Sequence, residues 1–349
     1  RALLLLVVSC PCALVVSVPL SFFSGIGCAS RKGILIKGSG YMEQLAKLGV
    51  CVFDKTGTLT KGQFSLTEVH AQDGDNDALL SMAAALEENS NHPIARSIVS
   101  ACPPERRSAV SEFTEQPGLG VSGILDGAHI YAGNRALMEH LGIVLSEEES
   151  AGTVIHVARE NEYLGYLVIE DCEKDEAKQA LAALHTQGVQ KLVMLTGDRE
   201  GAAKAVASRL GIDEYHASLL PGDKVGYVEG YLGKTGSVAF VGDGINDAPV
   251  LSRADVGIAM GAMGSDAALE AADVVLMQDK LTALPLAVRI SRKTKRIVME
   301  NIVAALAVKA VVLVLGALGV ASMWIAIFAD VGVLILAVLN AMRALTIKD

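Results

Sequence analysis

Residues 49–62, GVCVFDKTGTLTKG, join a short apolar run to a polar loop that begins at Asp54. Short apolar runs bounded by turn residues predict buried β-strands. Three more such runs follow later in the chain, and apolar residues at helical spacing lie between them. Strands that alternate with helices predict a parallel sheet covered on both faces. The predicted strands are KLVML (191–195), SVAFV (237–241) and VGIAM (256–260), and the predicted helices are 175–186 and 201–210.

Three aspartates follow these strands: Asp54 after the first, Asp198 in the TGD turn after the second, and Asp243 in GDGINDAP after the third. The carboxyl ends of parallel strands meet at one edge of the sheet, where α/β proteins bind ligands. Aspartates scattered among turns are the alternative, but three at equivalent strand ends favour one shared site.

Asp54 has the features of a nucleophile for phosphoryl transfer. A carboxylate at a strand end can form an aspartyl-phosphate, and this reaction needs neutralised charge and aligned atoms. Mg²⁺ prefers oxygen ligands and takes one or two carboxylates together with phosphate and water. We expect Asp54, Asp243 and the backbone carbonyl of Thr56 to supply the protein ligands.

Further side chains suit the same site. Thr196 offers a hydroxyl group and Lys224, in PGDKV, offers an ammonium group for the phosphoryl oxygens. Asn246 and Asp247 follow Asp243 within four residues, in a turn that can return to the site. The predicted catalytic group is therefore Asp54, Thr196, Lys224, Asn246 and Asp247.

The region from about Phe64 to Gly165 has a different pattern of apolar and polar residues. It carries alternating strands at 152–160 and 162–170 and a helix at 77–88, and it interrupts the alternation of strand and helix. We interpret it as an inserted domain. Within it, GLGVSG (118–123) fits the letters of a dinucleotide fingerprint, but a proline precedes it and a strand-like run follows, so that reading is rejected.

Both ends of the chain are apolar enough to cross a membrane. Residues 2–29 carry no charge, and residues 303–345 carry only Lys309, Asp330 and Arg343. A span needs about 20 apolar residues, so we expect one span in the first run and two in the second, with a break at 316–322. Because the chain starts at Arg1 inside the first run, we expect a fragment that begins within a membrane helix. Basic residues flank the central region, which predicts that it is cytoplasmic.

The first predicted span contains the sequence Cys10-Pro11-Cys12. Cysteines two positions apart point to different faces of a regular helix, and proline distorts the helix. This distortion would allow both thiols to face one cavity, where thiolates suit soft or borderline cations. Cysteines that merely pack are the alternative, and it leaves the proline unexplained. Lys309 and Asp330 are charges that are costly in a bilayer and usually functional; a structural ion pair between them is also open.

The remaining composition excludes other classes of protein. The net charge of −9 and the lack of a basic aromatic patch argue against nucleic-acid binding. In a reducing cytosol, Cys28, Cys51, Cys102 and Cys172 are expected to be buried thiols rather than a disulfide framework.

The motifs DKTGTLTKG, TGD and GDGINDAP, in this order and spacing, resemble those of the P-type ATPases. CPC and SNHPIA (90–95) narrow the resemblance to the heavy-metal-transporting branch. The resemblance implies a haloacid-dehalogenase-like α/β phosphorylation domain, an inserted α+β nucleotide-binding domain, and three transmembrane helices. It also implies ATP and Mg²⁺ as cofactors, with ATP bound around Glu87, His92, Gly118, Gly120, Asn134 and Asp198.

The segments NIVAALAVK (301–309) and ADVGVLILAVLNAMRAL (329–345) resemble the zinc, cadmium and lead exporters of this branch. The resemblance implies export of Zn²⁺, Cd²⁺ or Pb²⁺ bound by Cys10, Cys12 and Asp330, with Lys309 as a counter-ion. A copper(I) pump is the alternative, although monovalent copper would have no use for Asp330. Members also carry further helices and an actuator domain with a Thr-Gly-Glu loop, a sequence that these residues lack, so we expect a missing N-terminal part as partner and a bacterial inner membrane as location.

Two rivals come from other classes. A membrane-tethered haloacid-dehalogenase-like phosphatase usually has a second aspartate two residues after the nucleophile, where this chain has Thr56. A non-enzymatic metal-binding membrane protein would not need Asp54, Lys224 or Asp243. The predicted division of the chain is a membrane helix at 1–36, a phosphorylation domain at 37–64 and 166–285, a nucleotide-binding domain at 65–165, and two membrane helices at 286–349.

Overall fold

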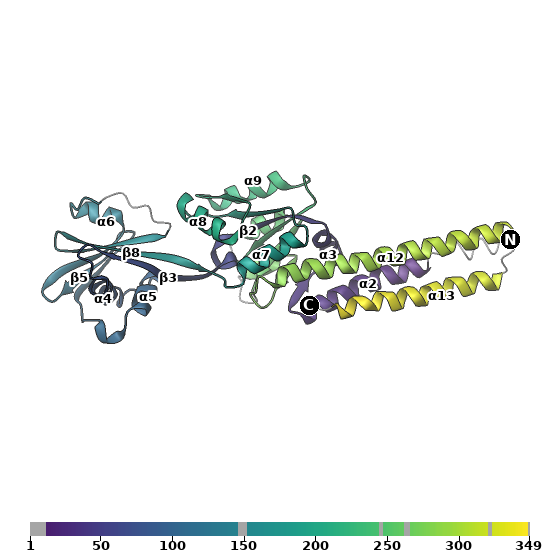
Figure 1. Ribbon diagram of the computed structural model, residues 1–349, viewed down its shortest axis with the longest axis horizontal. Helices are drawn as coiled ribbons and strands as arrows, with labels where there is room; N and C mark the ends of the chain where they lie inside the picture. Colours follow the sequence, from purple (N-terminus) through teal and green to yellow (C-terminus); the bar gives the residue numbers. More distant parts are fainter. Residues whose placement is uncertain (1–11, 146–151, 244–246, 262–265, 320–322, 348–349) are drawn as a thin grey trace.

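The computed structural model describes residues 12–145, 152–243, 247–261, 266–319 and 323–347. The molecule is elongated, with two β-sheet domains in succession and a group of long helices at the far end (Figure 1). The predicted α/β fold with an inserted domain and three long apolar helices is confirmed.

The central domain is built on a seven-stranded sheet with the order β1-β13-β12-β11-β2-β9-β10. Its neighbours are parallel except at the edge, where β1 is antiparallel to β13. The strands predicted at 49–53, 191–195, 237–241 and 256–260 are all present. The strands are β1 (Ile34–Ile36), β2 (Leu48–Asp54), β9 (Lys191–Leu195), β10 (Glu214–His216), β11 (Ser237–Gly242), β12 (Val256–Met260) and β13 (Val274–Leu276).

Helices cover both faces of this sheet, as the alternation predicted. In β2, which is buried along its whole length, Cys51 and Phe53 join the core beneath α7, α8 and α12, while Val50 and Val52 join the core beneath α9 and α10. Successive side chains of a strand point to opposite faces, so one apolar run can serve both cores. The helices of this domain are α3 (Ser39–Ala46), α7 (Ala177–Thr186), α8 (Glu200–Leu210), α9 (Pro221–Tyr231), α10 (Ala248–Arg253) and α11 (Asp266–Ala271).

The inserted domain is a six-stranded antiparallel sheet with the order β3-β8-β7-β6-β5-β4. The chain enters it along β3 and leaves it along β8, and these two strands pair from Thr60↔Glu173 to Ala71↔Gly165. The sheet thus includes residues on both sides of the 65–165 range. Its elements are β3 (Thr60–Ala71), β4 (Ser111–Gln116), β5 (Gly120–Leu125), β6 (Ala128–Gly133), β7 (Thr153–Arg159), β8 (Glu162–Glu173), α4 (Asn76–Glu87), α5 (Pro93–Ala101) and α6 (Arg135–His140).

Three helices are long and apolar enough to cross a membrane: α2 (Cys12–Arg31), α12 (Ala283–Ala317) and α13 (Met323–Met342), which continues into a 3-10 turn (Arg343–Thr346). They lie side by side (Figure 1). The 35 residues of α12 extend about 52 Å at 1.5 Å per residue, well beyond the roughly 30 Å of a hydrocarbon core. α12 therefore also runs outside the bilayer, where its Leu284, Ala287 and Val288 join the core of the central domain.

None of the five cysteines that the structure describes forms a disulfide. Cys28, Cys51 and Cys102 are buried, as predicted, whereas Cys172 is only half-buried. Cys10 and Pro11 lie outside the described residues, so the proposed proline distortion stays a prediction.

A polar junction ties the three membrane helices together. The buried Asn301 of α12 donates to the backbone oxygen of Ala337 in α13 at 3.1 Å and to Ser21 Oγ in α2 at 3.4 Å. Asn340 donates to Asn301 Oδ1 at 2.9 Å. Because Asn301 is buried, these hydrogen bonds meet little competition from water and help to fix the relative position of the three helices.

Replacing Asn301 with alanine should lower the stability of the helix group by roughly 1–2 kcal/mol, since about 0.6 kcal/mol is typical of one interhelical hydrogen bond. The measurement is thermal unfolding of the complete protein in detergent. Val303→Ala is the matched control, because this exposed side chain is removed without any loss of polar contact. Equal unfolding temperatures for the two variants would contradict the role of the junction.

Candidate functional site

Lys224 joins two aspartates at the carboxyl edge of the central sheet. Its Nζ lies 2.6 Å from Asp54 Oδ1 and 3.1 Å from Asp247 Oδ1. Asp54 ends β2, Lys224 lies in the first turn of α9, and Asp247 directly precedes α10. Asp54 and Asp247 are only 8% and 3% exposed, so these charges interact with little screening by water.

Asp243 completes a group of three carboxylates. Ligand oxygens of Asp54, Asp243 and Asp247 all lie within 4.8 Å of one another. Gly57, in the loop after Asp54, has a left-handed φ of +73°, and a Cβ at this position would overlap Asp243 Oδ2. Glycine therefore allows the loop, which also carries the Thr56 carbonyl, to pack directly against the third carboxylate.

The donor set fits Mg²⁺, which is a hard cation that binds carboxylate and carbonyl oxygens. Three carboxylates that converge on one point with a single ammonium group leave negative charge uncompensated, and a divalent cation would balance it. Asn246, which was predicted to belong here, lies outside the described residues.

Burial and mutual repulsion shift the pKa values of this group. Burial raises the pKa of Asp54 to about 6, the Asp247 carboxylate adds to the rise, and Lys224 opposes it. Burial and the Asp247 carboxylate also raise the pKa of Asp243. Burial lowers the pKa of Lys224, but Asp54 and Asp247 more than reverse this, so it stays above its usual value. Lys224 is consequently a permanent cation at neutral pH.

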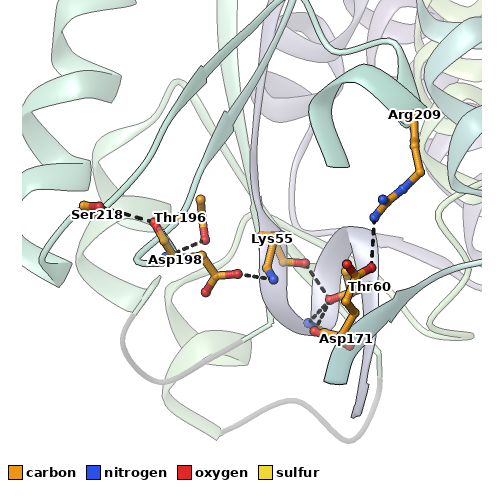
Figure 2. Close-up of polar contacts among 9 residues, drawn as sticks. Lys55, Thr60, Asp171, Thr196, Asp198, Arg209 and Ser218 are labelled. Atoms are coloured by element: carbon orange, nitrogen blue, oxygen red, sulfur yellow. Dashed lines mark hydrogen bonds and ion pairs between the residues drawn. The ribbon is translucent and has the colours of Figure 1, made fainter. Parts of the chain in front are cut away.

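The next strand end is connected to the same loop by an ion pair. Lys55, which is buried, pairs with Asp198, which follows β9 in the TGD turn (Figure 2). Thr196 is 2% exposed, and its hydroxyl oxygen accepts a hydrogen bond from the Asp198 amide at 3.1 Å. In the structure Asp198 is thus a partner of Lys55, and Lys55 is a residue that our sequence reasoning missed although it directly follows Asp54.

A second missed group lies where the inserted domain begins. Thr60 Oγ1, in the first residue of β3, lies 2.5 Å from Asp171 Oδ2 of β8 and 3.0 Å from the Lys55 carbonyl oxygen (Figure 2). The Gly57 amide donates to the same hydroxyl oxygen at 3.2 Å. Burial raises the pKa of Asp171, and the hydrogen bond from Thr60 opposes this rise. One threonine therefore connects the loop after Asp54 to both strands that carry the insert.

The predicted ATP-contacting residues of the insert lie in two groups. Glu87 ends α4, and the exposed His92 caps the start of α5, where its Nδ1 accepts from the Ile94 amide at 3.2 Å. Asn134 caps α6, and its Nδ2 donates to the backbone oxygen of Gly118 at 2.7 Å.

The first group lies near β4, and the second lies where β5 packs on β6. Burial raises the pKa of Glu87 to about 7, and the Glu115 carboxylate on β4 adds to the rise, so the end of α4 lies near the strand that leads to Gly118. Gly120 has a φ of +152° and lies so close to Ala132 and Gly133 that a Cβ would overlap their backbone. Gly120 thus allows β5 to pack closely on β6, beside Asn134.

In the membrane region, Lys309 of α12 and Asp330 of α13 line one small cavity. Ala13 of α2 also lines it, directly after Cys12. The other lining residues are apolar, so the cavity holds two opposite charges within a hydrocarbon surrounding. The structure brings Lys309 and Asp330 to the end of α2 that carries Cys12, whereas Cys10 lies outside the described residues.

Comparison with known proteins shows which family this chain matches. The family of haloacid dehalogenase-like hydrolases matches residues 48–255. The chain is 50% identical over 354 residues to a cadmium, zinc and cobalt-transporting ATPase of Bacillus subtilis, and this match covers 100% of the chain and 50% of the relative. The chain therefore spans about half the length of the curated relatives it matches.

Solved structures of ATPases are also similar to this chain. A zinc-transporting PIB-type ATPase in the E2·Pi state matches with a TM-score of 0.88 and 38% identity, over 98% of this chain and 57% of that protein. The catalytic domain of the CPx-ATPase CopB-B matches with a TM-score of 0.60 and 30% identity, over 74% of this chain and 97% of that domain.

Glu87→Gln should remove a pH dependence from the stability of the inserted domain. A carboxyl group whose pKa rises on folding stabilises the fold below its usual pKa, and this stabilisation is lost as the pH rises through the folded value. Folding raises the pKa of Glu87 from its usual 4.5 to about 7. The stabilisation lost between these two pH values therefore amounts to roughly 3 kcal/mol.

The measurement is protection of the α4 amides in native-state hydrogen exchange, corrected for intrinsic rates, between pH 5 and pH 8. The wild type should lose protection with rising pH, while Glu87→Gln stays level; the exposed Glu139→Gln is the control. A wild type without pH dependence would refute the buried, protonated state of Glu87.

Proposed function

Because the chain belongs to the haloacid dehalogenase-like hydrolases and, among them, to the CPx-type, heavy-metal branch of the P-type ATPases, we propose that it provides the phosphorylation, nucleotide-binding and part of the transport machinery of an ATP-driven exporter of divalent metal ions. The proposed ions are Zn²⁺ first, with Cd²⁺ and Pb²⁺ as further substrates. The proposed location is a bacterial inner membrane with the two β-sheet domains on the cytoplasmic side.

The observation that carries this proposal is the contact of Lys224 with Asp54 and Asp247 at the sheet edge. In the proposed reaction an Asp54 carboxylate oxygen attacks the γ-phosphorus of ATP. The bond from that phosphorus to the β–γ bridging oxygen breaks, and ADP leaves with the electron pair. With a pKa of about 6, Asp54 is ionised at neutral pH and can act as the nucleophile.

The surrounding residues have positioning and electrostatic roles. Lys224 neutralises charge on Asp54 before the reaction and can then contact the oxygens of the transferred phosphoryl group. Electrostatic stabilisation of this kind is a main source of catalysis in phosphoryl transfer. The Thr196 hydroxyl retains a proton to donate to a phosphoryl oxygen, since the Asp198 amide occupies only its oxygen. Asp54, Asp243 and the Thr56 carbonyl would hold Mg²⁺, which supplies charge neutralisation when bound.

The inserted domain would bind the nucleotide. Glu87, His92, Gly118, Gly120 and Asn134 are the proposed contacts, and their position on the insert, apart from the carboxylates at the sheet edge, assigns them to affinity rather than chemistry. Asp198, which pairs with Lys55 and remains partly exposed, is a further proposed ATP-binding residue.

The metal would bind in the membrane between Cys10, Cys12 and Asp330, with Lys309 as a built-in counter-ion once the metal has left. Two thiolates and a carboxylate suit a borderline divalent cation better than Cu⁺. Hydrolysis of the aspartyl-phosphate would require a water-positioning loop, and the Thr-Gly-Glu sequence expected for it is absent from these 349 residues. We therefore propose that turnover depends on a further part of the protein.

Asp54→Asn should abolish phosphorylation, because it removes the nucleophile while keeping the size of the side chain. The measurement is transfer of radiolabelled γ-phosphate from ATP to the complete protein, as an acid-stable, hydroxylamine-labile adduct. In the wild type, labelling should decline as the pH falls through about 6, the pKa of Asp54. Asp75→Asn, a helix cap in the insert, is the control; normal labelling of Asp54→Asn would sink the assignment.

Asp330→Ala should abolish binding of Zn²⁺ and metal-stimulated ATP hydrolysis, because a ligand is lost. Lys309→Ala should instead retain binding and slow release of the metal. The measurements are metal stoichiometry and ATPase activity of the purified complete protein, with labelling from inorganic phosphate as proof that the catalytic domains are intact. Full binding and turnover by Asp330→Ala would leave only a structural ion pair.

A further inference from the structure

A pocket with a strongly basic lining lies beside α12, outside both sites described above. We call it the basic pocket; its charged residues are Arg289, Arg292, Lys293, Arg296, Glu300 and Arg343. Five cationic side chains thus surround one carboxylate, in a chain whose net charge is −9. Such a concentration of like charge is unfavourable unless a counter-ion relieves it.

Most of this positive charge has no partner in the protein. Arg343 lies 3.4 Å from Glu300, and Arg292 donates to the backbone oxygens of Ala46 and Leu48. Within the part of the chain that the structure describes, no carboxylate lies within ion-pair distance of Arg289, Lys293 or Arg296. Arg289, Lys293 and Arg296 are four and three positions apart, so they lie on one face of α12. All three are exposed.

The position of the pocket identifies the source of the counter-ion. Between Glu300 and Ala317, the sole charged residue of α12 is Lys309. This apolar stretch is the membrane span of α12. Arg343 reaches the pocket from the end of the span of α13. The basic pocket therefore lies at the level of the cytoplasmic headgroups, where clusters of Lys and Arg next to membrane helices bind anionic lipid.

We propose that the basic pocket binds the phosphate headgroup of an anionic phospholipid, for which phosphatidylglycerol is the probe. The phosphate lies among Arg289, Lys293 and Arg296. The bound lipid holds α12, α13 and the end of α7 together at the membrane surface, at the point where the helix leaves the bilayer and enters the core of the phosphorylation domain.

The test compares binding of phosphatidylglycerol and phosphatidylcholine to the purified complete protein, by native mass spectrometry from detergent micelles with increasing amounts of each lipid. No ATP or transported metal is added, so the result does not depend on the proposed transport function. The triple variant Arg289→Gln/Lys293→Gln/Arg296→Gln is compared with Lys178→Gln/Lys204→Gln/Lys234→Gln, which removes three exposed cations elsewhere.

The wild type and the control variant should retain phosphatidylglycerol in preference to phosphatidylcholine, and the pocket variant should bind it at least about tenfold more weakly, since each cation near a lipid surface contributes about fivefold. If the triple variant does not elute as a folded protein, Lys293→Gln alone should bind about fivefold more weakly. Unchanged binding by the folded pocket variant overturns the proposal. Displacement of the lipid by millimolar glycerol 3-phosphate also overturns it, because the pocket would then take a soluble phosphate.

Discussion

The convergence of three carboxylates at the sheet edge, with one ammonium group bridging two of them, is the constraint on which the rest of the structure depends. Asp54 and Asp247 are buried and Asp243 is half-buried. Burial, together with repulsion between the carboxylates, raises the pKa of Asp54 to about 6. Such a group is stable only if a rigid scaffold holds it. The parallel sheet provides this scaffold, because two of the carboxylates follow neighbouring strands, β2 and β11, whose register fixes their separation.

The same loop that carries Asp54 also anchors the inserted domain. Lys55 pairs with Asp198 on one side, and its carbonyl oxygen lies next to Thr60, which contacts Asp171 on the other. Consequently, any rotation of β3 and β8 relative to the central sheet changes contacts within six residues of Asp54. The attachment of the insert and the shape of the carboxylate site cannot vary independently.

The sequence was sufficient for the features that depend on local pattern. Apolar runs predicted the strands. Because parallel strands end at one edge, the sequence also predicted one shared site for Asp54, Asp198 and Asp243; the structure brings Asp243 to Asp54 and pairs Asp198 with Lys55. The apolar lengths predicted the three spans. Contacts between distant polar residues were not predictable: Thr60 and Asp171 are 111 positions apart, and Asn301 and Ala337 are 36 apart, with no periodicity to link them. The antiparallel sheet also begins earlier and ends later than its texture suggested, since β3 and β8 continue as a polar, half-exposed pair.

The order of the strands in the central sheet has a consequence for how the protein is made. β2 lies between β9 and β11, yet both partners are encoded at least 137 residues after Asp54, as β9 starts at Lys191. During synthesis from the N-terminus, the insert emerges whole and can complete its own antiparallel sheet while β2 still has two open edges. An unpaired apolar strand is prone to pair with other chains. The insert folds early and α2 is attached to the membrane. Both would keep β2 away from other nascent chains until β9 and β11 have been synthesised.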